Sequence, residues 1–275
     1  MKPKSFKSYA LVFLFILITG ITVKAGEDKY SKDLHKEYET NDQTHLQITN
    51  KYGDVEITNW QKDMVVIDVK ITVDHRKEEK ARELLEYITV DFSMNSNTIT
   101  AITNIDDKFN KSGWFFNFDS DNKEFSIDYD IKMPKQLQLT MENKYGNVFI
   151  DEVTGQADIT IKYGNLKANK ILRGNTKPLS HVYLAYSDGA IEEADWLKLS
   201  LKYSKLELEK STAVIAVTKY SKFYNDQISS IVAESKYDHY YLGQISNLVV
   251  EAKYTDFKID DLMGKLDIET KYGDV

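Results

Sequence analysis

Tyrosine recurs along this chain at a nearly fixed interval, and that interval limits the possible folds more than any other feature. The series is Tyr145, Tyr163, Tyr186, Tyr203, Tyr220, Tyr237, Tyr254 and Tyr272. Successive members are 17 or 18 residues apart, except that Tyr163 and Tyr186 are 23 apart. Tyr52 is an isolated earlier copy, and Lys precedes each of the nine tyrosines except Tyr186. A fixed period shorter than any common helical repeat predicts stacked β-coils.

Each unit contains two short stretches in which apolar and polar residues alternate. Leu199 and Leu201 precede one tyrosine, and Leu206 and Leu208 follow it. Alternation with a period of two is typical of half-buried strands, and turn-forming residues such as Ser211-Thr212 separate the stretches. Stacking equivalent units about 4.8 Å apart places each inward side chain on its copy in the next coil. The sequence therefore predicts an all-β solenoid of 17–18-residue coils over residues 135–275.

Residues 1–25 have the pattern of a secretion signal. Lys2, Lys4 and Lys7 precede an apolar stretch from Leu11 to Val23, and Ala25 ends a small-residue cleavage pattern. An uncleaved membrane anchor is the alternative, although a spanning helix needs roughly 20 apolar residues. No second apolar stretch follows, so we expect no transmembrane segment in the mature chain. The protein is expected to be exported to the periplasm or the outer cell surface.

Composition excludes several kinds of site and partner. The chain has no Cys, which rules out disulfides, thiolate metal sites and a lipoprotein anchor. Removing the signal takes away four Lys and no acidic residue, which leaves 32 basic and 43 acidic residues and a net charge of −11. Such an excess of negative charge repels nucleic acid, so no nucleic-acid partner is expected.

Residues 26–134 do not follow the regular repeat. The segment around Tyr52 resembles one coil, and residues 65–73 alternate as a strand. Ala81, Leu84 and Leu85 have helical spacing, which predicts a helix near residues 77–88. Solenoids need their end coils covered, so we interpret residues 26–134 as an N-terminal cap containing the first coil and one short helix.

The lysines that precede the tyrosines should form a column on the outer face. Parity within the strands places the Tyr side chains facing inward or at a corner, and the lysines facing outward. The column comprises Lys162, Lys202, Lys219, Lys236, Lys253 and Lys271. Like charges directly opposite in a sheet repel, and Glu234, Glu251 and Glu269 stand two positions earlier on the same face. The face is therefore either a charge-balanced solvated surface or a row of cations and aromatic edges that grips an anionic glycan.

The widened unit between Tyr163 and Tyr186 is a second candidate binding site. It carries Arg173, Lys177, His181 and Tyr183 in the one sizeable insertion of the repeat. Loops on rigid scaffolds concentrate binding residues, although a neutral insertion is the alternative interpretation. A third candidate, a calcium site or an aromatic plug, falls in residues 112–124, which combine clustered aromatic and acidic residues.

Catalytic, metal-binding and cofactor motifs are not found. The five His residues form no His-Glu-x-x-His pattern, and neither a Gly-x-Ser-x-Gly elbow nor a phosphate-binding Gly-rich loop is present. No residue is therefore assigned a catalytic role. Acidic pairs such as Asp260-Asp261 suit glycoside hydrolysis in principle, but surface acids are abundant here.

Two repeat units resemble a known family. The segments 50–57 and 143–150 share an Asn-Lys-Tyr-Gly core followed by Asp or Asn and then Val, and a strand ending at Pro134 precedes the second of them. This pattern is similar to the adhesin-like β-strand-repeat proteins of Gram-negative envelopes, which are related to auto-transporter adhesin head domains. The resemblance implies a right-handed parallel β-helix, an exported location and no enzymatic activity. Ser204, Ser221, Asp238 and Thr255 replace the Gly in later units, so we expect the geometry of their turns to differ.

Two functional hypotheses follow. The first is an exported, non-enzymatic β-solenoid that acts as an adhesin-like scaffold or binding protein, with a glycan or another envelope protein as partner. The second is a carbohydrate-active β-helix enzyme, either a polysaccharide lyase or a hydrolase. Residues 272–275 open a new coil. We expect the natural chain either to continue beyond Val275 or to pair there end to end with another copy, because an uncovered coil exposes strand edges.

Overall fold

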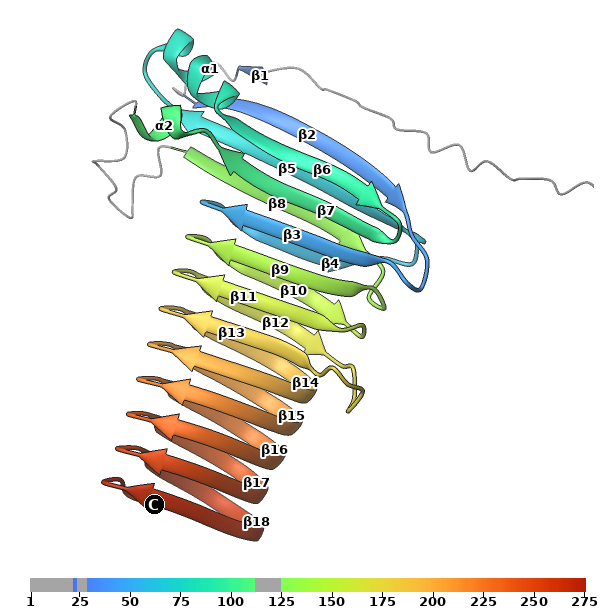
Figure 1. Cartoon of the computed structure of the whole chain (residues 1–275). Coiled ribbons are helices and arrows are strands. Elements are labelled where there is room, and N and C mark those ends of the chain that lie inside the picture. Colours follow the sequence, from blue (N-terminus) through green and yellow to red (C-terminus); the bar gives the residue numbers. More distant parts are fainter. Residues whose placement is uncertain (1–21, 24–28, 112–124) are drawn as a thin grey trace, which may run out of the picture.

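The protein is all-β, with two short helices near one end (Figure 1). The structure is a computed structural model that describes residues 22–23, 29–111 and 125–275. The first part contains β1 Thr22–Val23, β2 Lys29–Glu39, β3 His45–Lys51, β4 Val55–Asn59, β5 Met64–Asp74, α1 Glu78–Glu86, β6 Ile88–Asn95, β7 Thr98–Ile105, α2 Asp107–Lys111 and β8 Phe125–Met133. The second part contains β9 Gln138–Lys144, β10 Val148–Val153, β11 Ala157–Lys162, β12 Asn165–Ile171, β13 Ser180–Ala185, β14 Asp188–Lys202, β15 Lys205–Lys219, β16 Lys222–Lys236, β17 His239–Lys253 and β18 Asp256–Lys271.

Strands from β9 onward pair in parallel, and the pairing follows the sequence repeat. Leu199 lies opposite Ala216, Ala216 opposite Ala233, and Ala233 opposite Val250. Each of these steps spans one repeat unit, so chemically equivalent residues lie side by side. The expected all-β class is confirmed. The two stretches expected in each unit are joined in β14 to β18 into one strand of 15 or 16 residues that bends at its centre.

The strands lie in two layers, which we call the first and second walls (Figure 1). The first wall contains β4, β10, β12 and the leading halves of β14 to β18. The second wall contains β3, β9, β11, β13 and the trailing halves of the same long strands. Inward side chains of both walls form one continuous apolar core, in which Ile150, Ile159 and Leu199 are fully buried.

Antiparallel strands extend both walls at the N-terminal end. On the first wall β2 pairs with β5 and β5 with β8, while β6 pairs with β7 on the second wall. The helix α1 contacts β2, β5 and β6 through Ala81, Leu84 and Leu85, which are buried. The sequence predicted one helix in this region. The structure adds α2, so the expectation of a single helix is wrong; its 5 residues are too few to show helical periodicity.

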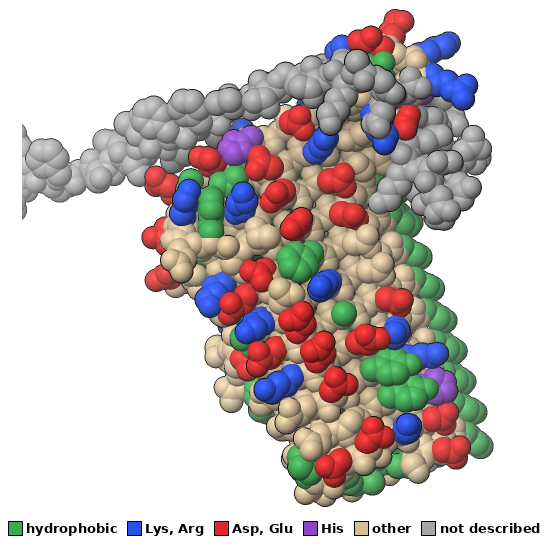
Figure 2. Space-filling view, turned by 180° about the vertical axis from the view of Figure 1, so that it is seen from behind, with side chains coloured by type: hydrophobic (Ala, Val, Ile, Leu, Met, Phe, Trp, Pro, Cys, Tyr) green, Lys and Arg blue, Asp and Glu red, His purple; other side chains and the backbone are tan. Residues whose placement is uncertain are grey.

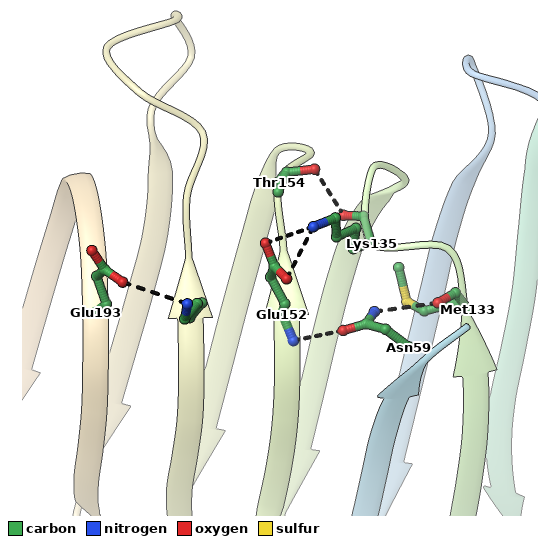
Figure 3. A network of polar contacts seen from close by, with 7 residues as sticks. Asn59, Met133, Lys135, Glu152, Thr154 and Glu193 are labelled. Atoms are coloured by element: carbon green, nitrogen blue, oxygen red, sulfur yellow. Dashed lines mark hydrogen bonds and ion pairs between the residues drawn. The ribbon is translucent and has the colours of Figure 1, made fainter. Parts of the chain in front are cut away.

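A polar network joins the N-terminal region to the parallel strands (Figure 3). The side-chain amide of Asn59 donates to the carbonyl of Met133 at 3.2 Å, and its oxygen accepts the backbone N–H of Glu152 at 2.7 Å. Lys135 Nζ lies 3.1 Å from the carboxylate of Glu152. Three segments that are distant in sequence are thereby fixed at one edge of the molecule. Residues 1–21, 24 and 25 of the expected signal segment 1–25 lie outside the described residues, as does the aromatic and acidic stretch 112–124.

Candidate functional site

Each tyrosine of the repeat directly follows a strand, and those from Tyr52 to Tyr254 lie in a tight turn that leads into the next strand. Tyr203, for example, lies between the last residue of β14 and the first of β15. All nine repeat tyrosines have φ between +51° and +66°, the left-handed region that L-residues rarely adopt. The backbone N–H of Tyr203 donates to the carbonyl of Lys219 in the next coil at 3.0 Å. The tyrosines therefore lie at a corner of the coils, and the inward alternative is wrong because the turn ends the strand alternation.

The residue after each tyrosine sits against the neighbouring coil. A Cβ on Gly146 would lie 1.9 Å from the carbonyl oxygen of Gly53, and one on Gly164 equally close to that of Gly146. Later coils carry hydroxyl residues here instead. The N–H of Ser187 donates to the hydroxyl of Ser204, at 3.2 Å. The left-handed tyrosine is thus kept in all nine turns, although the hydrogen bonding beside it changes.

Asp238 occupies this position in one coil and is almost fully buried. Its carboxylate accepts hydrogen bonds from the hydroxyls of Thr218 and Ser235, both at 2.7 Å, and from the N–H groups of Ser221 and Lys236, at 2.6 and 2.8 Å. Four donors compensate the buried charge, which would otherwise be costly to desolvate. The carboxylate therefore serves the packing of adjacent coils.

The tyrosine rings stack on one another along this corner, and we call them the tyrosine ladder. It comprises Tyr52, Tyr145, Tyr163, Tyr186, Tyr203, Tyr220, Tyr237, Tyr254 and Tyr272. Centroids of neighbouring rings are 4.7–5.1 Å apart and the interplanar angles are 1–19°. The rings from Tyr163 to Tyr254 are each 37–47% exposed. Figure 2 shows a row of hydrophobic side chains along one long edge of the molecule. Because ring faces cover one another, the ladder presents ring edges and hydroxyls to solvent.

A column of lysines lies on the second wall beside the ladder, and we call it the lysine column. It comprises Lys51, Lys144, Lys162, Lys202, Lys219, Lys236, Lys253 and Lys271, and Ala185 interrupts it. Several Nζ atoms lie over tyrosine rings, such as Lys219 over Tyr220 at 5.3 Å and Lys144 over Tyr145 at 4.6 Å. Such contacts hold the ammonium groups close to the ladder.

Acidic neighbours compensate only part of the lysine column. Glu234, Glu251 and Glu269 stand beside it in the last coils and line a groove of about 480 Å³ with Lys236 and Lys253. The equivalent neighbours in the middle coils are uncharged: Thr160, Ser200 and Val217. Within the part of the chain that the structure describes, no ion pair involves a lysine of the column. The middle coils therefore have fewer acidic neighbours than the last coils, although Glu142 and Asp158 line a groove with Lys162.

The four residues of the widened unit are separated by the structure. Arg173 and Lys177 lie in the connection between β12 and β13, at the edge opposite the ladder. His181 and Tyr183 lie on β13, on the outer face of the second wall. Lys162 Nζ is 5.8 Å from the ring centroid of Tyr183. Of the four residues, only His181 and Tyr183 are placed beside the lysine column.

His181 lies between a carboxylate and a hydroxyl that sequence reasoning did not connect. Its Nδ1 is 3.5 Å from Asp158 Oδ1, and its Nε2 is 3.0 Å from Ser200 Oγ. Burial lowers the pKa of His181, and the nearby Asp158 opposes that shift. These groups have the order of a Ser-His-Asp triad. They lie on β11, β13 and β14, which pair with one another in parallel, so backbone N–H groups of these strands are used in the sheet.

The first wall bears an acidic groove of about 410 Å³ near the N-terminal end. Its lining includes Asp54, Glu56, Asp128 and Asp130, together with His35. A hydrogen bond with Asp68 raises the pKa of His35. Among residues 29–111 and 125–275, no group of three or more His, Asp or Glu side chains is arranged to hold a metal ion. No helix within the described ranges is both long and apolar enough to span a bilayer.

Comparison of the sequence with protein-family profiles and with curated proteins finds no match. A search of solved structures finds matches at low identity and low TM-score. A proposed cell adhesion protein from Clostridium sporogenes has a TM-score of 0.34 and 11% identity, with 84% of this chain and 99% of that chain covered. A proposed adhesin from Bacteroides fragilis has a TM-score of 0.39 and 12% identity, with 89% of this chain and 97% of that chain covered. A proposed lipid binding protein from Parabacteroides distasonis has a TM-score of 0.40 and 10% identity, with 88% of this chain and 96% of that chain covered. Function must therefore be argued from the surface itself.

Proposed function

We propose that the chain is a right-handed parallel β-helix that binds a linear anionic polymer, in the first place an acidic glycan, along the lysine column. The observation that carries this proposal is the in-register row of eight lysines beside the exposed tyrosine ladder. The sequence also supports export to the periplasm or outer surface without a lipid anchor. Residues 26–134 then act as the cap of the stack.

Electrostatics support a polyanion as the ligand. Neighbouring strands are about 4.8 Å apart, so adjacent ammonium groups repel by about 0.9 kcal/mol in water. Among the described residues, no carboxylate forms an ion pair with Lys162, Lys202 or Lys219, although Glu142 and Asp158 line the same groove as Lys162, and Glu234 lines that of Lys219. An anionic chain that lies along the column relieves this repulsion wherever two lysines are adjacent and releases the small anions gathered there. Such binding is attractive locally although the whole protein is acidic.

The ladder favours charge recognition over sugar stacking. Sugar rings commonly stack on open aromatic faces, but here each inner ring has a tyrosine on both sides within 5.1 Å. The exposed edges offer hydroxyl donors to carboxylates or sulfates. A neutral polysaccharide consequently gains little from this surface. Charge on the polymer is therefore the feature that distinguishes ligands from non-ligands.

The test compares polygalacturonate with neutral dextran by titration calorimetry at several salt concentrations. The variant carries Lys202→Gln and Lys219→Gln. The matched control carries Lys170→Gln and Lys210→Gln, which remove the same charge near the bend, at the edge opposite the ladder. We expect polygalacturonate to bind, dextran not to bind, and the salt slope of log K to fall by roughly 1.4 in the first variant alone.

Equal losses in both variants, or equal binding of dextran, would contradict the proposal. Equal affinity for a DNA duplex would contradict the assignment to glycan. Reducing ends released from the polymer would favour the second hypothesis, a polysaccharide lyase or hydrolase. Capture of an envelope protein in place of polymer would redirect the assignment to a protein partner.

We also propose that copies of the chain pair along β18. Leu262, Met263 and Leu266 on this strand are 37%, 59% and 44% exposed, which supports an apolar contact there. Sedimentation velocity of the full chain and of the variant Leu266→Lys tests the idea. A concentration-dependent dimer that the substitution abolishes supports pairing, whereas a monomer at all concentrations contradicts it.

A further inference from the structure

We propose that the tyrosine ladder is a site of oxidative cross-linking, at which neighbouring coils are joined through dityrosine. The co-reactant is hydrogen peroxide used by a haem peroxidase or a similar one-electron oxidant. This inference is independent of polymer binding, because it needs only the ring geometry and its exposure. Its product is a covalent link between residues that are one repeat unit apart.

Ring geometry provides the necessary proximity. Tyr203 and Tyr220 have centroids 4.8 Å apart with an interplanar angle of 6°, and Tyr220 and Tyr237 have 4.8 Å and 1°. Tyr237 and Tyr254 are 4.7 Å apart. In such parallel rings, the carbon beside one hydroxyl lies roughly 5 Å from its equivalent on the next ring. Both side chains must turn about their torsions to bring the two carbons to bonding distance.

The chemistry balances with peroxide as the oxidant. Each phenol loses one electron and its hydroxyl proton to give a phenoxyl radical. Two neighbouring radicals then form one carbon–carbon bond between the positions beside their oxygens. The hydrogen on each bonded carbon moves to the oxygen of the same ring, which restores both phenols. Two tyrosines and one hydrogen peroxide thus give one dityrosine and two waters.

Exposure separates the ladder from the buried tyrosines. Tyr203, Tyr220 and Tyr237 are 43%, 40% and 37% exposed, so an oxidant in solution reaches them. Tyr240 is 1% exposed and Tyr129 3%. A radical formed anywhere on the ladder has a neighbour already in place, and coupling within one molecule therefore has a high effective concentration. Oxidation should yield links between adjacent coils before links between molecules.

The test treats dilute full-length protein with horseradish peroxidase and hydrogen peroxide. A protease that cleaves after Glu cuts at Glu207, Glu234 and Glu251, so that Tyr203, Tyr220, Tyr237 and Tyr254 fall on four different peptides. We expect dityrosine fluorescence and peptide pairs that together have lost two hydrogens and join tyrosines of adjacent coils. The half-buried Tyr224 and Tyr241, whose rings stack at 4.5 Å on the first wall, should form a separate linked pair.

A triple variant provides the decisive comparison. Tyr186→Phe, Tyr220→Phe and Tyr254→Phe keep the stack but leave each tyrosine between Tyr163 and Tyr272 with only Phe beside it. Linked peptides that join neighbouring positions from Tyr163 to Tyr272 should fall at least tenfold, while the stacked pairs of Tyr145 with Tyr52 and Tyr163 are left intact. The control variant Tyr30→Phe, Tyr38→Phe and Tyr87→Phe should leave their yield unchanged.

Circular dichroism establishes that both variants fold. Should the ladder variant be misfolded, the single change Tyr220→Phe replaces it and should remove only the pairs of Tyr220 with Tyr203 and Tyr237. Unchanged yields of these pairs would overturn the proposal. So would links formed mainly between separate molecules or between tyrosines that are not neighbours.

Discussion

Replacing Tyr220 in two different ways separates the stacking of its ring from the strain of its backbone. Its φ of +53° is unfavourable for any residue with a Cβ, and its ring is stacked on Tyr203 and on Tyr237, each at 4.8 Å. Tyr220→Ala removes the ring and retains the strained conformation. Tyr220→Gly removes the ring and also relieves the strain.

The structure sets the expected size of both effects. Each aromatic pair contributes about 0.5–1.5 kcal/mol, so losing two pairs lowers the free energy of unfolding by about 2 kcal/mol in Tyr220→Ala. Gly at a positive φ is favoured over Ala by about 1 kcal/mol, after allowing for its greater freedom in the unfolded chain. Tyr220→Gly should therefore cost only about 1 kcal/mol.

Urea unfolding followed by circular dichroism measures these differences. Tyr220→Phe is the control, because it preserves ring and backbone and should change stability by less than about 0.5 kcal/mol. If the Gly variant were as unstable as the Ala variant, the left-handed turn would not be strained. If neither variant differed from the parent protein, the ladder would contribute nothing to stability.

Further substitutions test the packing and the titrating groups. Gly146→Ala should lower the free energy of unfolding by about 3 kcal/mol or more, since the new Cβ would meet the carbonyl of the preceding coil at 1.9 Å. Ser204→Ala, at the equivalent position of a later coil, should lower it by about 1 kcal/mol. Urea unfolding measures both. Asp238→Asn should cost about 2 kcal/mol in the same assay, because its amide NH₂ would face hydrogen-bond donors. Burial lowers the pKa of His181. Its contribution to the free energy of unfolding is therefore present above the pKa of about 6.5 that it has in the unfolded chain, and it is lost as pH falls through the folded pKa. The hydrogen bond to Asp68 raises the pKa of His35. The contribution of His35 to the free energy of unfolding is therefore present below its unfolded pKa of about 6.5, and it is lost as pH rises through the folded pKa. Thermal melts at a series of pH values measure both effects. The pH dependence of Tm due to each histidine should weaken in His181→Gln and in His35→Gln respectively, and an unchanged dependence would contradict the assignments.

The repeat period predicted how neighbouring coils align. Residues one period apart, such as Leu199 and Ala216, occupy equivalent positions in their repeat units and lie opposite each other in the structure. This succeeds because a fixed period and parallel pairing leave one register that keeps every apolar residue inside.

The conformation of the tyrosines was not predictable from the same pattern. Tyr favours strands, and counting alternate positions from Leu201 places Tyr203 on the inner side. The chain instead turns at Tyr203 with φ of +51°. Strand parity does not extend through a left-handed turn. Of the two positions expected for the tyrosine side chains, the inward one is therefore wrong and the one at a corner is right.

The remaining differences arise from contacts that no local pattern encodes. Strand β2 lacks a clear alternation because several of its side chains are half-buried on both sides. The proximity of Asp158, His181 and Ser200 depends on how the widened coil aligns with its neighbours. A loop of 8 residues between β12 and β13 absorbs the extra length, which the sequence alone could not place.

The most direct test of the central claim is the affinity of the full chain for galacturonate oligomers of increasing length. A single site that runs along the lysine column should bind longer oligomers progressively more tightly, and the salt dependence should steepen with length until the oligomer covers the column. Affinity and salt dependence that do not change with oligomer length would contradict a linear site of this kind.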